Sequence, residues 1–319
     1  MFRAVLEVGS SADILGRMNQ HRTRVRKAVV PAAGLGTRHF PASHAVKKEL
    51  FPVVGQDGIA RALIHYHLLE LVTAGIEEVC IIVQPGDDAP IRAYFEGPDE
   101  AYLKRLAKYP DLLKEAEGMR ELSGRIRFAV QQSQEGFGHA VYQTKDFVAG
   151  ETFLLCLGDH LFRGSPVSPH KELADMAARS NGKSVSAVNA IGPSELKGYG
   201  TIAGRRRSEN PRLVDVSLII EKPAVDVARE KLHVDGLPPD TFLGWFGMHL
   251  LNPTIFDVLD EMIRDDTRDA GEFQLTRAQE IQRQREGYLA LEMPPTSRRF
   301  DFGVPDDFLK SVQEFRLPD

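Results

Sequence analysis

The sequence predicts an α/β protein with a Rossmann-like, mostly parallel sheet flanked by helices. Three observations support this prediction. Short apolar segments rich in β-branched residues recur through the first half, as is typical of buried strands. Segments with helical periodicity separate them, which favours strand–helix–strand units. The first apolar segment ends in a glycine-rich loop, where open parallel sheets bind ligands.

Strands and helices alternate regularly in the first half. Apolar residues at helical spacing run from Ile59 to Ala74 and stop before Gly75, so we expect a helix there. A second helix should follow Asp88, and a third should lie within 138–147. The expected strands are 26–32, 77–83, 125–131 and 152–159. A charged segment, residues 99–124, favours a helical excursion on the surface with a break at Pro110.

The second half has a different texture, with longer strands and polar turns. We expect strands over 184–191, 213–223 and 242–251, followed by a helix over 252–263 that Asn252 caps. Because no repeat or low-complexity linker divides the chain, residues 25–319 should form one unit. Its halves are about 25–165 and 166–319, the latter including a helical C-terminal part.

Composition and charge exclude several classes of function. The net charge of −5 and the pI near 6.1 leave no general basic field for nucleic acid. The two cysteines, Cys80 and Cys156, lie in apolar segments, which indicates buried thiols in a reducing cytoplasm. No apolar run approaches the roughly 20 residues that span a membrane. Residues 1–24 are interpreted as an appendage, and Glu7 argues against a secretory signal there.

The loop after the first strand is suited to bind phosphate or a nucleobase. Its small residues leave backbone N–H groups uncovered, and Arg38, Lys47 and Lys48 then add positive charge. A dinucleotide fingerprint fails because His39 stands in place of the third glycine, and no P-loop is present. The alternative is a tight turn with incidental surface cations.

At this point the sequence resembles a known family. The segment "GLGTRHFPASHAVKKELFPV" is similar to the signature of the sugar-1-phosphate nucleotidyltransferases, and most similar to the branch that forms UDP-glucose from UTP and glucose 1-phosphate. The resemblance extends from about Arg26 to the C-terminus. It implies that Arg38 and Lys48 act on the nucleotide phosphates. It also implies substrate contacts from five residues of the signature, namely Ala33, Gly34, Gly36, Thr37 and Glu49.

The segment "VQQSQEGFGHAV" offers a reader for the base. A glutamine amide has a donor and an acceptor, as uracil's pairing edge does. From chemistry alone, a plain polar loop remains possible. The family has a glutamine five residues before a glycine turn, so the resemblance implies that Gln131 reads uracil and that Gly136 contacts the base.

Two aspartates are candidates for magnesium. Asp159 ends an apolar strand at the ligand-binding edge of the sheet, although a lone Asp there is also a common turn former. The resemblance implies that Asp159 holds Mg²⁺ together with Asp301 of "RRFDFG". Asp306 and Asp307 are interpreted as the start of the next helix.

Three further residues form the expected sugar end. A carboxylate accepts hydrogen bonds from neighbouring hydroxyls, and a lysine binds phosphate. The pair Glu221 and Lys222 could also be an ordinary exposed strand end. The resemblance assigns Glu221 to sugar hydroxyls, Lys222 to the sugar phosphate and Gly200 to the sugar ring, while 271–280 closes the site.

The implied reaction is attack of a sugar phosphate oxygen on the α-phosphorus of UTP, with pyrophosphate leaving and Mg²⁺ as cofactor. The substrates would be small molecules, and the family suggests a homodimer or homotetramer. His44 replaces a lysine of the family pattern, and Trp245 replaces an arginine. Trp245 fits either a core position or stacking on a sugar. These departures leave open another hexose 1-phosphate, dTTP, or a weakly active regulatory paralogue.

Overall fold

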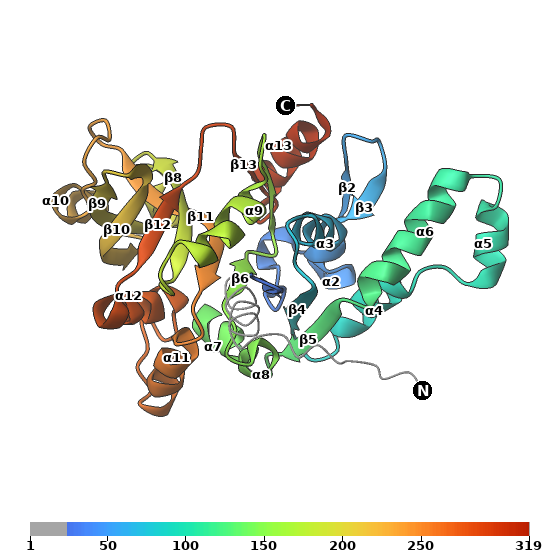
Figure 1. Cartoon of the computed structure of the whole chain (residues 1–319). Helices are drawn as coiled ribbons and strands as arrows, with labels where there is room; N and C mark the ends of the chain where they lie inside the picture. The colour runs from blue at the N-terminus through green and yellow to red at the C-terminus, as the bar shows by residue number, and fades with distance from the viewer. Residues whose placement is uncertain (1–23, 319) are drawn as a thin grey trace, which may run out of the picture.

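The computed structural model describes residues 24–318, whose centre is a nine-stranded sheet that runs across the molecule (Figure 1). The expected appendage therefore lies outside the described residues, except for Arg24. In sheet order the strands are β5 (Ile126–Val130), β4 (Glu78–Val83), β1 (Lys27–Pro31), β6 (Phe153–Cys156), β11 (Phe242–Leu251), β8 (Val185–Ile191), β12 (Leu289–Glu292), β10 (Asn210–Glu221) and β9 (Gly200–Arg207).

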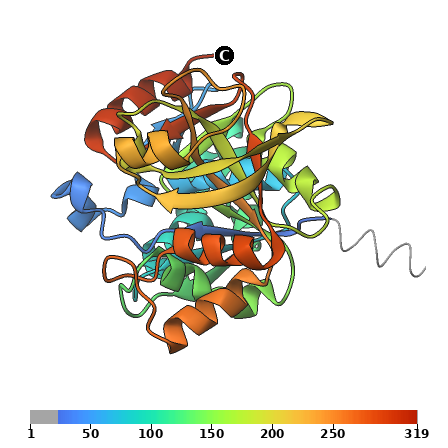
Figure 2. The same cartoon turned by 90° about the vertical axis from the view of Figure 1, so that its left-hand side faces the viewer.

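The fold class predicted from the sequence is confirmed. Strands β5, β4, β1 and β6 are parallel neighbours, and only β10 and β11 run against the common direction. Figure 2 turns the side that carries β9, β10 and α10 (Val225–Lys231) toward the viewer. Because the sheet is continuous, both expected halves of the chain contribute strands to it.

Helices cover both faces of the sheet because strand residues alternate between them. Ala28 and Val30 of β1 join one apolar cluster, whereas Val29 between them joins the other. The first cluster includes residues of α3 (Leu63–Thr73), α4 (Asp88–Glu96) and α9 (Pro169–Ala174). The second includes residues of α7 (Phe137–Tyr142), α8 (Lys145–Val148), α11 (Ile255–Arg264) and α12 (Leu275–Glu286). Cys80 and Cys156 are free and buried, as predicted.

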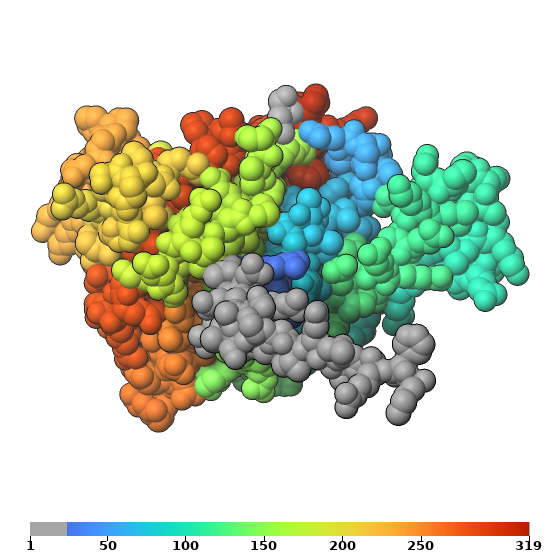
Figure 3. Space-filling model, viewed as in Figure 1, coloured from blue at the N-terminus to red at the C-terminus, as the bar shows by residue number. Residues whose placement is uncertain are grey.

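The charged segment 99–124 forms the expected helical excursion. It consists of α5 (Glu100–Leu106) and α6 (Pro110–Ser123), with proline in the first turn of α6. Helix α6 packs on α4, and the pair α5–α6 projects from the body as an arm (Figure 3). The helices that the structure describes include none long and apolar enough to cross a membrane.

Two helix starts differ from the sequence expectation. Residues before Leu63 form the hairpin β2 (Pro52–Val54) and β3 (Ala60–Ala62) instead of the first turn of a helix, because Gly58, at φ +78°, closes a tight turn. Helix α11 has Thr254, not Asn252, at its N-cap. The Asn252 side chain still accepts a hydrogen bond from the Thr254 N–H at 3.1 Å.

A second small sheet connects distant parts of the chain. Strand β7 (His160–Arg163) pairs antiparallel with β13 (Arg298–Asp301), and α13 (Pro305–Arg316) follows directly. Asp306 and Asp307 lie in the first turn of α13, as predicted. The pairing places His160 opposite Asp301, so two segments that are far apart in the sequence lie side by side.

We predict that Gly158→Ala destabilises the fold, because a Cβ at Gly158 would lie 2.2 Å from the carbonyl oxygen of Pro31. The free energy of unfolding should fall by about 1–3 kcal/mol or more. Gly118→Ala is the control: it lies within α6 with no atom near its added Cβ, so it should raise stability by up to about 1 kcal/mol. Urea unfolding measures both, and a Gly158→Ala protein as stable as the wild type would contradict the packing argument.

Candidate active site

The candidate active site lies at the carboxyl ends of β1, β4, β5 and β6, which share one edge because these strands are parallel. Three predicted parts of the site follow these strand ends. The glycine loop begins at Ala32 after β1, Gln131 follows β5, and Asp159 lies shortly after β6. Strand β11 brings the sugar end to the same edge. Its Met248 pairs with Cys156, so Trp245 lies beyond the end of β6. Strand β9 pairs with this extension and contributes Gly200.

The glycine loop is exposed and held at its base. Ala32 donates its N–H to Ile82 at 2.8 Å, and Ala33 is buried. An added Cβ at Gly34 would meet no protein atom within 4 Å, so the backbone there faces open space. Gly36 has a φ of +65°, a left-handed conformation that favours glycine.

The residues after the loop contact the chain next to β13, the strand that carries Asp301. Thr37 and Arg38 are exposed within a single helical turn, Thr37–His39. His39, the residue that breaks the dinucleotide fingerprint, places its Nε2 2.9 Å from the carbonyl oxygen of Phe302. This contact fixes the end of the loop next to Asp301.

The two predicted metal ligands lie together around one histidine. His160 Nδ1 is 2.8 Å from Asp159 Oδ1, and His160 Nε2 is 3.3 Å from Asp301 Oδ2. The second contact is an ion pair without hydrogen-bond alignment. Lys48 Nζ donates to the other Asp159 oxygen at 2.7 Å. Burial would raise the pKa of Asp159, but His160 and Lys48 hold it well below its ordinary value.

One oxygen of each carboxylate faces Gly303, and the Gly303 N–H donates to Asp301 Oδ1 at 2.7 Å. An added Cβ at Gly303 would lie 2.8 Å from Asp159 Oδ2 and 3.0 Å from Asp301 Oδ1, so only glycine leaves that space open. Carboxylate oxygens are the ligands that Mg²⁺ prefers, and it commonly takes one or two from protein and the rest from water and phosphates. Among residues 24–318, no group of three or more His, Cys, Asp or Glu side chains is placed to hold a metal ion.

Glu49 lies next to Lys48 and is buried, with 1% of its surface exposed. Its Oε1 is 3.9 Å from Lys48 Nζ and has no hydrogen-bond partner among the described residues. Burial raises the pKa of Glu49 to about 7 against the nearby cation. The Glu49 carboxyl therefore lies beneath Lys48 and does not face solvent, and its predicted contact with substrate stays a prediction.

At the expected base end, the predicted residues contact one another within the loop 131–136. Gln131 is buried and donates through Nε2 to the carbonyl oxygen of Gly136 at 3.1 Å. Gly136 packs so closely on the backbone of Phe273 that an added Cβ would lie 2.9 Å from the Phe273 nitrogen. Phe273 also donates its N–H to Glu135 at 2.8 Å. The predicted pair is therefore in contact, and segment 271–280 holds it.

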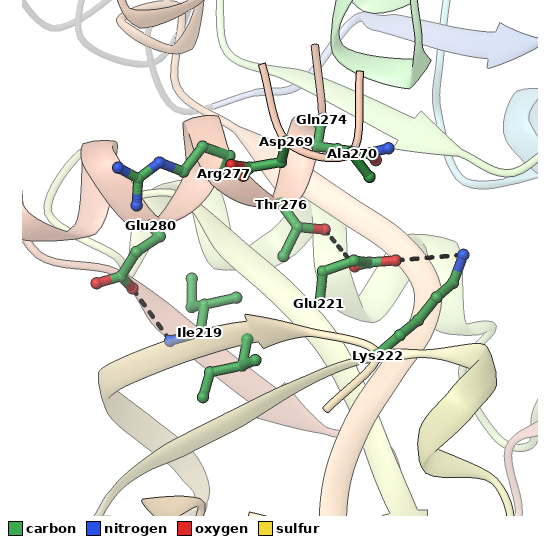
Figure 4. Close-up of a pocket in the computed structure, with 10 residues that line it drawn as sticks. Ile219, Glu221, Lys222, Asp269, Ala270, Gln274, Thr276, Arg277 and Glu280 are labelled. Carbon is green, nitrogen blue, oxygen red and sulfur yellow. Dashed lines mark hydrogen bonds and ion pairs between the residues drawn. The ribbon is translucent and has the colours of Figure 1, made fainter. Parts of the chain in front are cut away.

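The expected sugar end surrounds a cavity of about 150 Å³ whose lining includes Tyr199, Gly200, Glu221, Lys222, Trp245, Thr276 and Arg299. Thr276 donates to Glu221 Oε2 at 2.7 Å, and Lys222 Nζ is 3.6 Å from Glu221 Oε1. Lys222 has a φ of +45°, which is strained for a residue with a side chain and concentrates at functional sites. A larger cavity of about 480 Å³ adjoins it and shares Glu221, Lys222 and Thr276 (Figure 4).

Trp245 both packs in the core and borders the cavity. It is 7% exposed within an apolar cluster, and its Nε1 has no hydrogen-bond partner among the described residues. An added Cβ at Gly200 would lie 2.2 Å from that nitrogen. The close approach of the indole therefore requires glycine at position 200.

Sequence reasoning missed two residues that the structure brings into the site, His160 and Arg299. His160 follows Asp159 directly, and Arg299 precedes Asp301 by two residues. Alternation along a strand would have placed Arg299 on the same face as Asp301. That signal needed the strand 298–301, which the sequence analysis did not anticipate.

Comparisons with known proteins agree with this geometry. A family model described as nucleotidyl transferase matches residues 27–315. UTP–glucose-1-phosphate uridylyltransferase 2 of Staphylococcus saprophyticus is 31% identical over 297 residues, covering 93% of each chain. The corresponding enzyme of Staphylococcus epidermidis is 31% identical over 299 residues, 93% of this chain and 94% of its own length.

Solved structures show the same fold. The UTP-bound UGPase from Acinetobacter baumannii superposes with a TM-score of 0.74 at 27% identity, over 91% of this chain and 93% of that one. A UDP-glucose pyrophosphorylase complexed with UDP-glucose gives 0.72 at 23% identity, over 91% and 98% of the two chains. The second likeness concerns the fold alone.

We predict that Glu49 makes stability depend on pH. The folded state favours the protonated form of Glu49. The stability that this carboxyl contributes is therefore fully present below pH 4.5 and is lost as the pH rises through about 7. Glu49→Gln keeps the volume without the charge. Relative to wild type, the variant should therefore gain on the order of 3 kcal/mol in free energy of unfolding between pH 5 and 8.

Urea unfolding at pH 5, 6, 7 and 8 measures this gain. The control is Glu121→Gln on α6, whose side chain is 76% exposed and should leave the pH dependence unchanged. A constant difference between Glu49→Gln and wild type across this range would show that Glu49 does not titrate as a buried acid.

Proposed function

The chain belongs to the nucleotidyl transferase family, and on this premise we propose that it transfers the uridylyl group of UTP to glucose 1-phosphate, giving UDP-glucose and pyrophosphate. The relatives named above carry this activity in their names. The observation that carries the proposal is that Lys48, Asp159 and Asp301 lie together at the edge shared by the glycine loop and the Glu221–Lys222 cavity. This arrangement suits a reaction that joins two phosphate esters.

The reaction needs charge neutralisation more than a strong base. A phosphate oxygen of glucose 1-phosphate forms a new bond to the α-phosphorus of UTP, and the bond from that phosphorus to the bridging oxygen of pyrophosphate breaks. The attacking oxygen is already anionic, so no proton must be removed. Catalysis then rests on holding two anions in line, which can contribute on the order of 7–11 kcal/mol.

At the nucleotide end, we assign the exposed loop to the triphosphate. Backbone N–H groups of Ala33, Gly34, Gly36 and Thr37 approach it, because nothing of the protein covers Gly34. Arg38 holds the departing phosphates, and Lys48 neutralises the α-phosphate. Glu49 supports Lys48 from its buried side.

Gln131 reads uracil in this proposal. In the structure its amide bonds to Gly136, so binding the base exchanges that internal hydrogen bond for bonds to uracil. Gly136 contributes backbone contact with the base. The exchange keeps the buried amide paired in both states, which avoids the cost of an unsatisfied polar group.

Asp159 and Asp301 are the residues that would hold Mg²⁺. When bound, the ion neutralises phosphate charge as a Lewis acid. His160 and Gly303 keep the two carboxylates in place and the space between them open. At the sugar end, Glu221 accepts bonds from sugar hydroxyls and Lys222 binds the sugar phosphate. We assign the backbone of Gly200, which packs against the Trp245 indole, to contact with the sugar ring.

We further expect a cytoplasmic enzyme, since UTP and sugar phosphates are cytoplasmic metabolites, and a homodimer or homotetramer. Light scattering on the purified chain tests the oligomer. The activity itself is tested by incubating the purified chain with UTP, glucose 1-phosphate and Mg²⁺. Chromatography should show UDP-glucose and pyrophosphate in equal amounts. A preference for dTTP, or no product at all, would overturn the assignment.

We predict that Asp301→Asn raises the Mg²⁺ concentration for half-maximal rate at least 10-fold, because one anionic ligand is lost. Chelation of the wild type with EDTA should abolish activity, and added Mg²⁺ should restore it. Asp306→Asn is the matched control, since Asp306 lies in the first turn of α13 and not at the site. An unchanged Mg²⁺ requirement in Asp301→Asn would contradict the metal assignment.

A further inference from the structure

Arg299 enters the sugar-end cavity from the strand that carries Asp301. Residues of β13 alternate between its two faces. Phe300 points into an apolar cluster that includes Phe315 of α13, and Arg298 pairs with Glu314 of the same helix at 2.8 Å. Arg299 lines the cavity instead, together with Glu221 and Lys222.

The guanidinium of Arg299 is held by neutral groups. It donates through Nη2 to the Tyr199 hydroxyl at 2.5 Å and through Nη1 to the Trp245 carbonyl oxygen at 3.1 Å. It also lies over the Tyr199 ring, 4.4 Å from its centroid. These contacts fix the guanidinium in position without neutralising its charge.

Tyr199 links Arg299 to the other cation of the cavity. Its carbonyl oxygen accepts the backbone N–H of Lys222 at 3.2 Å, while its hydroxyl accepts from Arg299. One residue therefore positions both cations at the same cavity. Lys222 has Glu221 as a nearby carboxylate, at 3.6 Å.

Arg299 lacks such a partner: among residues 24–318, no ion pair joins it to a carboxylate. A guanidinium has five N–H donors, and the structure shows two of them in use. A half-buried guanidinium that is fixed in position and has further N–H donors available is suited to bind an anion. Phosphate fits this fork because two parallel N–H groups meet two oxygens.

The position of Arg299 selects the phosphate among the anions of the proposed reaction. Residues two apart on a strand lie roughly 7 Å from each other on the same face. Arg299 is thus one such step from Asp301, the proposed metal ligand, and shares its cavity with Lys222. The group expected between a metal ligand and Lys222 is the sugar phosphate.

We propose that Arg299 is a second cationic ligand of the sugar 1-phosphate, which it binds together with Lys222, and that Tyr199 positions it. This inference rests on the proposed function. It adds a binding residue to which the family resemblance assigned no role. In the reverse reaction, the same pair would bind the sugar-side phosphate of UDP-glucose.

Steady-state kinetics of Arg299→Gln tests the proposal. We expect the KM for glucose 1-phosphate to rise about 10- to 100-fold, because a charged, two-point contact is lost. The KM for UTP should stay within about twofold. Calorimetry should show weaker binding of UDP-glucose and unchanged binding of UTP.

Arg298→Gln is the matched control, since its side chain lies on the opposite face of β13, against α13. It should change neither KM. Arg299→Lys keeps the charge but not the fork, so it should recover part of the loss. Tyr199→Phe should raise the KM for glucose 1-phosphate by a smaller factor, and it should add little in combination with Arg299→Gln.

The outcomes separate the two proposals. If the wild type forms no UDP-glucose, the proposed function fails. If the wild type is active and the KM for glucose 1-phosphate is unchanged in Arg299→Gln, only the role of Arg299 is overturned. Equal loss for UTP and glucose 1-phosphate would show a merely structural role and would also overturn it. Should Arg299→Gln not fold, Arg299→Lys and Tyr199→Phe decide the question by the same comparison, a raised KM for glucose 1-phosphate with an unchanged KM for UTP.

Discussion

The pairing of β7 with β13 is the constraint on which the site depends. It sets His160 opposite Asp301, so a strand leaving the central sheet and a strand near the C-terminus deliver two carboxylates to one place. Two partly buried carboxylates repel each other, and the imidazole between them offsets this repulsion. Burial alone would lower the pKa of His160, but both aspartates raise it above its ordinary value. The acidic pair is therefore stable within the fold before any ligand is considered.

Charge is balanced differently at the two ends of the site. At the proposed metal site, Lys48 is already in contact with Asp159, so a ligand that enters must share that lysine with a carboxylate. At the proposed sugar end, the hydrogen bonds of the Arg299 guanidinium within residues 24–318 go to the Tyr199 phenol and the Trp245 carbonyl oxygen. The first arrangement favours a dianionic or trianionic ligand that arrives with its own cation. The second presents a cation that is held in place and ready for an anion. Two negatively charged substrates can then be held side by side without a net excess of negative charge.

Periodicity and the signature resemblance predicted the loop after β1 and every strand of the central sheet except β9 and β12, because these features are encoded over short stretches of sequence. The pair Asp159 and Asp301 was also found, but only because the family pattern named it. The sequence did not reveal how they meet, because β7 and β13 are four residues each and pair across most of the chain. His160 and Arg299 were missed for the same reason. The sequence left open whether Trp245 packs in the core or lines the site. It does both, because β11 extends past the end of β6.

Segment 271–280 contacts both the proposed base end and the proposed sugar end of the site. Phe273 holds the base loop through Glu135 and Gly138, while Thr276, three residues later, holds Glu221 at the sugar end. Phe273 lies just before α12 and Thr276 lies in its first turn, and α12 packs on β10, so the same stretch of backbone holds both ends. Because the base loop and the Glu221 carboxylate share this support, the fold fixes the spacing between the two proposed ends of the site. Preorganisation of this kind lowers the entropic cost of aligning two reactants.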